Sequence, residues 1–184
     1  MFMTRVLLLI FVLVLVAFGV CAALFPLMRL TGPRIRDQSS EKAVYLWYEE
    51  TKFTIGSAHY FIRDYHRNNE CGDFKTAFIV SAALHVAACC LGAITCLLAA
   101  AHLCSHRKFN LCCSIVVLCF VTFACFATSI GTVIFLSCAD TCVNDNATRV
   151  VALRDQGYFL SEGFIFLCVA GCGFFMAVFL EVFS

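Results

Sequence analysis

The hydrophobic positions of this chain fall into long uninterrupted runs, and the polar positions gather between them. Residues 77–101 and 111–135 contain no Asp, Glu, Lys or Arg, and a short basic segment at 102–110 separates them. A helix needs about 20 apolar residues to cross the hydrocarbon core of a bilayer. Both runs reach that length, and neither is restricted to one helical face as in a soluble protein. The pattern predicts a helical hairpin that crosses a membrane twice.

Two further apolar runs raise the expected number of crossings to four. One follows Arg5 and covers residues 6–25, and the other covers residues 159–181, with Glu162 near its start. A basic residue before an apolar stretch is also typical of a cleavable signal peptide. The first run is longer than the apolar core of such a peptide, so we expect a retained helix, with cleavage near Ala22 as the alternative.

The composition agrees with a membrane protein. Hydrophobic residues make up 62% of the 184 residues, only 14% are charged, and the mean hydropathy is +0.91. We predict an all-α membrane protein surrounded by the lipid bilayer: one domain, a bundle of four transmembrane helices with a small extracellular cap. The expected crossings are 6–25, 77–101, 111–135 and 159–181, the outer loops 28–73 and 136–157, and the cytosolic turn 102–110. A net charge of +1 indicates no nucleic-acid partner.

The segment 28–73 is the largest polar part of the chain, with acids and bases in balance and aromatic residues between them. Within it, residues 43–48 have the aromatic and β-branched content of a strand. Two interpretations stay open: a small ordered cap with a short sheet, or an aromatic belt at the membrane interface. The candidates for contact with a partner are Tyr45, Leu46, Trp47 and Tyr48.

Small residues recur at every fourth position of the second crossing, on one face where a neighbouring helix can approach closely. They are Ala88, Gly92, Cys96 and Ala100. The same helix carries His85, an ionisable residue deep within the apolar run. An intramembrane histidine is a candidate for a proton or ion pathway, but a neutral imidazole that bonds a neighbouring backbone or hydroxyl group is the simpler interpretation.

Most of the 14 cysteines lie inside apolar runs, where cysteine packs as a small hydrophobic residue. Those in the expected outer loops are Cys71, Cys138 and Cys142. One disulfide with one free or intermolecular thiol is the simplest outcome, and the pairing stays open. Beside the turn, the candidates for palmitoylation are Cys104, Cys112 and Cys113.

Four crossings place both termini on the same side as the turn 102–110. A count of Lys and Arg alone favours the reverse orientation, because the segment 28–73 holds so many of them. Those residues are matched by acids, however, and the loop 136–157 carries the glycosylation sequon Asn146-Ala147-Thr148 beside a cysteine pair. We therefore expect cytosolic termini, a plasma-membrane location and a glycan on Asn146.

Residue patterns for catalysis or metal binding are missing. The chain contains no Cys-x-x-Cys pair for thiol exchange, and the His and Cys residues near the turn match no common zinc spacing. Glu162, near a membrane face, is expected to be a capping or interfacial carboxylate. We predict that the chain is not an enzyme and has no catalytic residue, metal or cofactor.

The layout resembles the amastins, four-helix surface glycoproteins of trypanosomatid parasites with a claudin-like topology. The likeness covers nearly the whole chain: a large first outer loop containing Val44-Tyr45-Leu46-Trp47, a basic turn, a smaller second loop and a C-terminal helix. The first-loop signature is divergent, because Ala43 and Phe53 stand where that family has cysteines, so the signature disulfide cannot form. The resemblance implies a surface glycoprotein at the contact between parasite and host.

Two functions remain as hypotheses. The first is a multi-pass surface glycoprotein with a structural, adhesive or host-interaction role through its outer loops, as a homo-oligomer or with other surface membrane proteins. The second is an auxiliary channel subunit or small ion or proton transporter that uses His85 and the region of Glu162.

Overall fold

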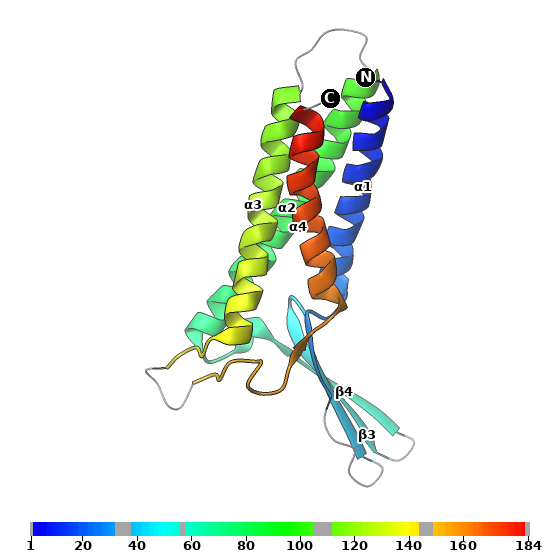
Figure 1. The fold of residues 1–184 in the computed structure, drawn as a ribbon. Helices are drawn as coiled ribbons and strands as arrows, with labels where there is room; N and C mark the ends of the chain where they lie inside the picture. The colour runs from blue at the N-terminus through cyan, green and yellow to red at the C-terminus, as the bar shows by residue number, and fades with distance from the viewer. Residues whose placement is uncertain (1, 32–37, 56–57, 105–111, 144–148, 183–184) are drawn as a thin grey trace.

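Long helices form the body of the molecule (Figure 1). The structure is a computed structural model that describes residues 2–31, 38–55, 58–104, 112–143 and 149–182. Within these ranges the helices are α1 (Phe2–Leu24), α2 (Gly72–Cys104), α3 (Cys112–Cys138) and α4 (Glu162–Val182). Each is long and apolar enough to cross a membrane. The predicted four-helix bundle is therefore confirmed, and α1 begins and α4 ends at the same end of it.

Two helices begin at other residues than the hydropathy pattern predicts. α2 begins at Gly72 rather than near residue 77, because Phe74 and Phe78 in its first turns are buried with the core of the molecule. At 1.5 Å per residue α2 is about 50 Å long, well beyond the roughly 30 Å of a bilayer core. α4 begins at Glu162 rather than 159, because Phe159 and Leu160 form a strand.

The buried side chains of the helices recur at alternating steps of three and four residues. In α3 the series is Ile115, Cys119, Thr122, Phe126, Ser129, Val133 and Leu136. A repeat of 3.5 residues is the contact seam of a left-handed helical bundle. Each helix packs on two neighbours, so that the four form a closed ring around the core: α1 packs on α2, α2 on α3, α3 on α4 and α4 on α1.

This repeat revises the predicted packing face of α2. Ala88 and Gly92 are buried as expected, whereas Cys96 and Ala100 are only partly buried. Steps of four residues drift off a seam of 3.5 residues, and Thr95 takes the buried position beside Cys96.

A few hydrogen bonds join the helices inside the bundle. The hydroxyl groups of Ser81 and Ser129 lie 2.7 Å apart across the contact between α2 and α3. Nε2 of His85 donates to the carbonyl oxygen of Gly19 at 2.8 Å, and its ring packs edge-on against Phe126. The structure thus gives His85 the backbone bond expected of a neutral imidazole.

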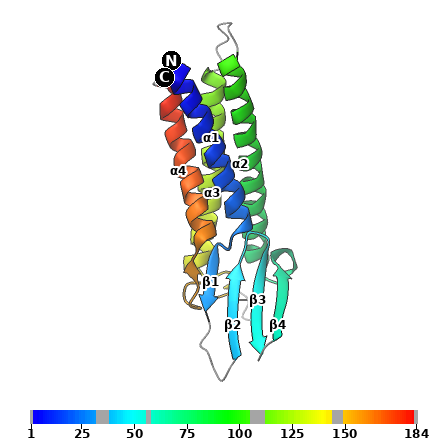
Figure 2. The ribbon, with the colours of Figure 1, turned by 90° about the vertical axis from the view of Figure 1, so that its right-hand side faces the viewer.

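An antiparallel sheet stands at the end of the bundle away from α1's first residue (Figure 2). Its strands are β1 (Met28–Thr31), β2 (Gln38–Val44), β3 (Tyr48–Ile55), β4 (Ala58–Tyr65) and β5 (Phe159–Leu160). Their spatial order is β4-β3-β2-β1-β5. We call this sheet, with the loop residues 139–143 and 149–158, the cap. Of the two interpretations of segment 28–73, the ordered sheet is confirmed.

The predicted strand at 43–48 is wrong. Val44 ends β2 and Tyr48 begins β3, and the residues between them form a tight turn in which Tyr45 N–H donates to Tyr48 O at 2.8 Å. The apolar content of this turn has another cause. The turn lies at the end of the sheet nearest the helices, so Leu46 is 1% exposed within the core of the molecule.

Candidate functional site

One face of the cap carries a ladder of matched side chains across β3 and β4. The pairs, each directly opposite in the register, are Tyr48–Tyr65, Glu50–Arg63, Lys52–Phe61 and Thr54–His59. They comprise an aromatic contact, an ion pair, a cation–π contact and a hydrogen bond. Cross-strand pairs of this kind stabilise a sheet and hold its surface in one arrangement. We call this surface the paired face.

Glu50 is the central charge of the paired face. Its side chain is buried, Nε of Arg63 lies 2.8 Å from its carboxylate, and Nζ of Lys52 lies at 3.5 Å. The hydrogen bond to Glu50 raises the pKa of Arg63 above its usual value. The same guanidinium lies over the ring of Tyr48, 5.1 Å from its centroid. A buried carboxylate is tolerated here because two cations compensate its charge.

The loop before α4 contacts the opposite face of the sheet at Glu49. The hydroxyl of Tyr158 donates to Glu49 at 2.8 Å, and Nζ of Lys42 lies 3.5 Å from the same carboxylate. Burial and the bond to Glu49 raise the pKa of Tyr158, so the phenol keeps its proton at neutral pH. These contacts hold the loop before α4 against the sheet.

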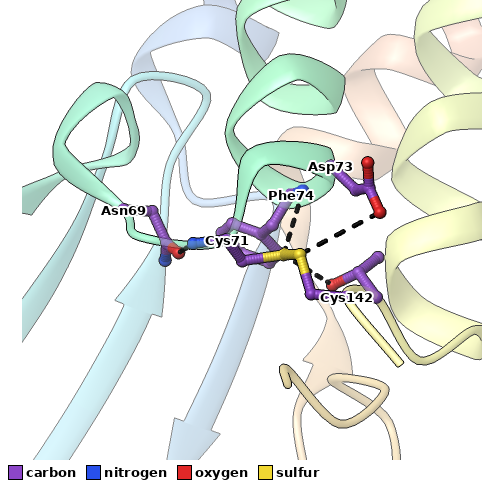
Figure 3. The surroundings of a disulfide bond; sticks show 6 residues. Asn69, Cys71, Asp73, Phe74 and Cys142 are labelled. Carbon is purple, nitrogen blue, oxygen red and sulfur yellow. Dashed lines mark hydrogen bonds between the residues drawn. A yellow bond between two sulfur atoms is a disulfide. The ribbon is translucent and has the colours of Figure 1, made fainter. Parts of the chain in front are cut away.

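A disulfide joins the two polar segments (Figure 3). Cys71, immediately before α2, is bonded to Cys142 beyond α3, and Asn69 Oδ1 accepts the backbone N–H of Cys71 at 2.9 Å. The sequence left the pairing open, and the structure selects these two residues. Cys138, the third candidate, is a free and exposed thiol. The bond ties the loop after α3 to the start of α2.

Asp140 organises the loop beyond this disulfide. Its carboxylate accepts hydrogen bonds from the guanidinium of Arg149 and from the backbone N–H of Ala152. The bond from Arg149 and then the bond from Ala152 lower the pKa of Asp140. A backbone bridge between Thr141 and Val150 completes the arrangement.

The outermost strand, β4, is open along one whole side. It is the last strand in the sheet order, and all eight of its residues are exposed. The backbone N–H of His66 donates to Trp47 O, which continues the ladder with β3. In an antiparallel ladder alternate residues point their backbone groups toward the neighbouring strand. The intervening residues therefore direct their N–H and C=O groups away from β3; they are His59, Phe61, Arg63 and Tyr65.

The predicted partner-contact residues lie at the other end of the sheet, beside α2. Leu46 is buried and therefore unavailable for contact with a partner, whereas Trp47 is 44% exposed. Tyr45 stacks on Tyr48, with ring centroids 4.8 Å apart. The carbonyl of Tyr45 accepts a bond from Nε2 of the buried His66 at 2.9 Å. Burial lowers the pKa of His66, so its ring is neutral at pH 7.

The remaining predicted residues lie at the ends of helices or outside the described residues. Glu162 begins α4 and forms an ion pair with Arg29 at 3.3 Å, as expected of an interfacial carboxylate. Cys112 and Cys113 are free and exposed at the start of α3, and Cys104 is the last residue of α2, where its side chain lies outside the described part of the chain. Asn146 also lies outside the described residues.

Sequence reasoning missed the pairs of β3 and β4. A usable signal was present, since Gly56-Ser57 stands between two stretches with strand-like residues, and a two-residue gap of this kind is typical of a β-hairpin. Among the described residues no group of three or more His, Cys, Asp or Glu side chains is placed to hold a metal ion.

The fold defines a class of protein: a bundle of four helices that are long and apolar enough to cross a membrane, with a small antiparallel sheet at one end. Beyond this class, no protein-family model matches the chain and no curated protein matches its sequence.

Proposed function

We propose that this chain is a multi-pass surface membrane glycoprotein with a structural or adhesive role, which it performs through the cap. The cap faces outside, both termini are cytosolic, the membrane is the plasma membrane, and Asn146 carries a glycan. The disulfide supports this orientation, because disulfides persist in oxidising compartments such as the cell exterior. The resemblance to the amastins is part of the same proposal, and it implies that the protein acts where two cells are in contact.

The open edge of β4 is the observation that carries the role. An exposed strand with unpaired backbone groups accepts an extended segment of another protein as an additional strand. The paired face holds the side chains of β4 in place beforehand, so little further ordering is needed when a partner binds. The partner expected from this chemistry is an extended segment of another surface protein, which pairs with the outward groups of Phe61 and its neighbours.

Two substitutions at Phe61 test this role. Phe61→Pro removes an outward N–H without removing a bond to β3, and proline is tolerated at such edge positions. Phe61→Ser removes the same side chain but keeps the N–H. We expect Phe61→Pro to reduce assembly in native gels and adhesion of expressing cells much more than Phe61→Ser does. Unchanged assembly and adhesion in Phe61→Pro at normal surface levels would reject the β4 edge as the contact.

The alternative function, a channel subunit or transporter that uses His85, has weaker support. Nε2 of His85 is already bonded to a backbone carbonyl, and the ring is packed against Phe126. Such a residue fits a contact between helices better than a site that exchanges protons with water. Reconstituted wild-type protein and His85→Ala are expected to show the same ion and proton flux, and a flux lost on substitution would restore the alternative.

A further inference from the structure

A groove opens where the cap meets the lipid-facing side of α2. It has a volume of about 590 Å³, within the range of ligand pockets. Its floor is formed by Phe78, Ile79, Ala82 and Ala83 of α2. The turn between β2 and β3 provides one wall, with Leu46 and Trp47, and the end of β4 with the following residues provides the other, with Tyr65, His66 and Arg67. The lining is almost wholly apolar or aromatic.

The groove lies at the level where α1 ends. His85 of α2 is bonded to Gly19 of α1, and α1 ends at Leu24, five residues later. The two helices run in opposite directions, and both rise about 1.5 Å per residue. Five residues after Gly19 in α1 therefore correspond to five residues before His85 in α2, and Leu24 is level with residues near Val80. The groove floor surrounds that position. A bilayer whose hydrocarbon core ends where α1 ends would place the groove at the boundary between acyl chains and headgroups in the leaflet on the cap side.

The side chains at the mouth of the groove match that boundary. Trp47, Tyr65 and Ile79 are each between 44% and 47% exposed, so the mouth of the groove presents apolar and amphipathic surface. Tryptophan and tyrosine favour the membrane interface because their rings are apolar and their polar groups can reach water. His66 stacks on Phe78 with centroids 3.8 Å apart and forms an uncharged wall.

Arg67 provides a single positive charge at this site. Its guanidinium lies over the ring of Tyr65, 5.5 Å from the centroid. Unlike Arg29, Arg63 and Arg149, it has no carboxylate within ion-pair distance among the described residues. A guanidinium binds a phosphate through a pair of parallel hydrogen bonds. An unpaired arginine beside an apolar groove therefore matches an amphiphile with a phosphate head and an acyl tail.

We propose that this groove is a binding site for one phospholipid of the leaflet on the cap side, with an acyl chain over Phe78 and Ala83 and the phosphate at Arg67. The bound lipid fills the space between the sheet and α2 and thereby couples the cap to the bilayer. This site shares only Tyr65 with the outward-facing positions of the β4 edge, and Phe61, where the edge is tested, does not line the groove.

The chain contains its own probe of this site, since Trp47 is its only tryptophan. Purified full-length protein in detergent micelles is titrated with phosphatidylcholine and phosphatidylglycerol that carry brominated acyl chains, which quench tryptophan fluorescence on contact. We expect saturable quenching at about one lipid per chain for both lipids. Brominated diacylglycerol, which lacks the phosphate, is expected to bind about three- to tenfold more weakly, as is typical of one partly exposed charged contact.

Matched variants separate the acyl contact from the phosphate contact. Ala83→Phe fills the groove and is expected to abolish saturable quenching, whereas Ala87→Phe, one turn away on the exposed side of α2, leaves it unchanged. Arg67→Gln is expected to weaken binding of both phospholipids about three- to tenfold but not that of diacylglycerol, and Arg67→Lys to recover part of the loss. Arg154→Gln, in the cap loop, is the charge control.

Three results would overturn the proposal. Linear quenching that is equal in all variants would mean contact with bulk lipid only. Equal binding of diacylglycerol and phospholipid would show that the phosphate makes no contact that contributes to binding. Stabilisation by millimolar inorganic phosphate that Arg67→Gln abolishes, without competition between phosphate and lipid, would assign Arg67 to a free anion instead of a lipid headgroup. Thermal melting of each variant distinguishes loss of the lipid site from loss of the fold.

Discussion

The bundle and the cap are held together by different kinds of contact. Within the bundle, apolar and small side chains meet along a regular seam, and the hydrogen bonds between helices are few, such as that of Ser81 with Ser129. In the cap, individual charged pairs such as Glu50 with Arg63 organise the surface. The helices of the bundle are long and apolar enough to cross a membrane, whereas the cap carries charged pairs. Substitutions should therefore act through volume in the bundle and through lost partners in the cap.

The largest effect is expected at the disulfide that connects the two regions. The bond between Cys71 and Cys142 closes a segment with a sequence separation of 71. Replacing both residues with serine should cost about 2–4 kcal/mol, because the unfolded chain regains the freedom that the bond removes. Melting of the cap, followed by Trp47 fluorescence in detergent, checks this. Cys138→Ser is the control, and a reductant should shift the melting of the wild type but not that of the double variant.

The next largest effect is expected at Gly163, where α4 starts beside the end of α1. A Cβ atom at this position would lie 2.5 Å from the carbonyl oxygen of Phe25 and 2.7 Å from that of Pro26. Gly163→Ala should therefore push α4 away and destabilise the protein by about 1–3 kcal/mol. Gly131→Ala is the matched control, since nothing lies within 4 Å of its added atom. Equal melting temperatures for the two variants would show that the close approach is absent.

Hydropathy alone was sufficient to place the bundle. An uncharged run such as 111–135 allows few structures besides a helix in lipid, because its backbone must bond within itself. The details of packing needed the structure. The face of α2 follows Thr95 instead of Cys96, since the seam has a period of 3.5 residues and small residues alone do not reveal it.

The cap was less predictable because its pairs are distant in sequence. Tyr158 bonds to Glu49 across 109 positions, and no local pattern indicates such a contact. The composition of residues 43–48 predicts one strand where the structure has a turn between β2 and β3, because a turn that packs against helices has the same composition as a strand buried on one face. The hairpin of β3 and β4 was more accessible, since its two-residue gap is a local signal.

Glu50 tests whether the cap depends on charged partners. Glu50→Gln keeps the shape of the side chain and removes the charge that Arg63 and Lys52 share. We expect a loss of about 1–2 kcal/mol, as for hydrogen bonds between a charged pair in a partly buried setting. Glu41→Gln is the control: its ion pair with Arg29 is longer, at 3.6 Å, and its side chain is 43% exposed. Loss of this ion pair should destabilise the protein by less than about 1 kcal/mol.

Acid should weaken the cap through His66. Burial lowers the pKa of this histidine in the folded protein, so the unfolded chain binds a proton more readily. Stability is therefore full above the unfolded pKa of about 6.5 and falls as the pH drops below it, by at most about 1.4 kcal/mol per pH unit. Melting of the cap between pH 7.5 and 5.5 measures the slope. His66→Phe should reduce it, whereas replacing the exposed His59 with Asn should leave it unchanged.

The smallest effect is expected at Ser81, inside the bundle. Ser81→Ala removes the hydroxyl that lies 2.7 Å from that of Ser129, yet Ser129 Oγ keeps a second acceptor, the carbonyl oxygen of Ser81 at 3.4 Å. Hydrogen bonds between membrane helices contribute about 0.6 kcal/mol on average. A loss of that size, measured by unfolding in detergent beside Glu50→Gln, would support the contrast between the regions. A loss larger than that of Glu50→Gln would reverse the contrast, because the hydroxyl pair in the bundle would then contribute more than the partly buried charged pair in the cap.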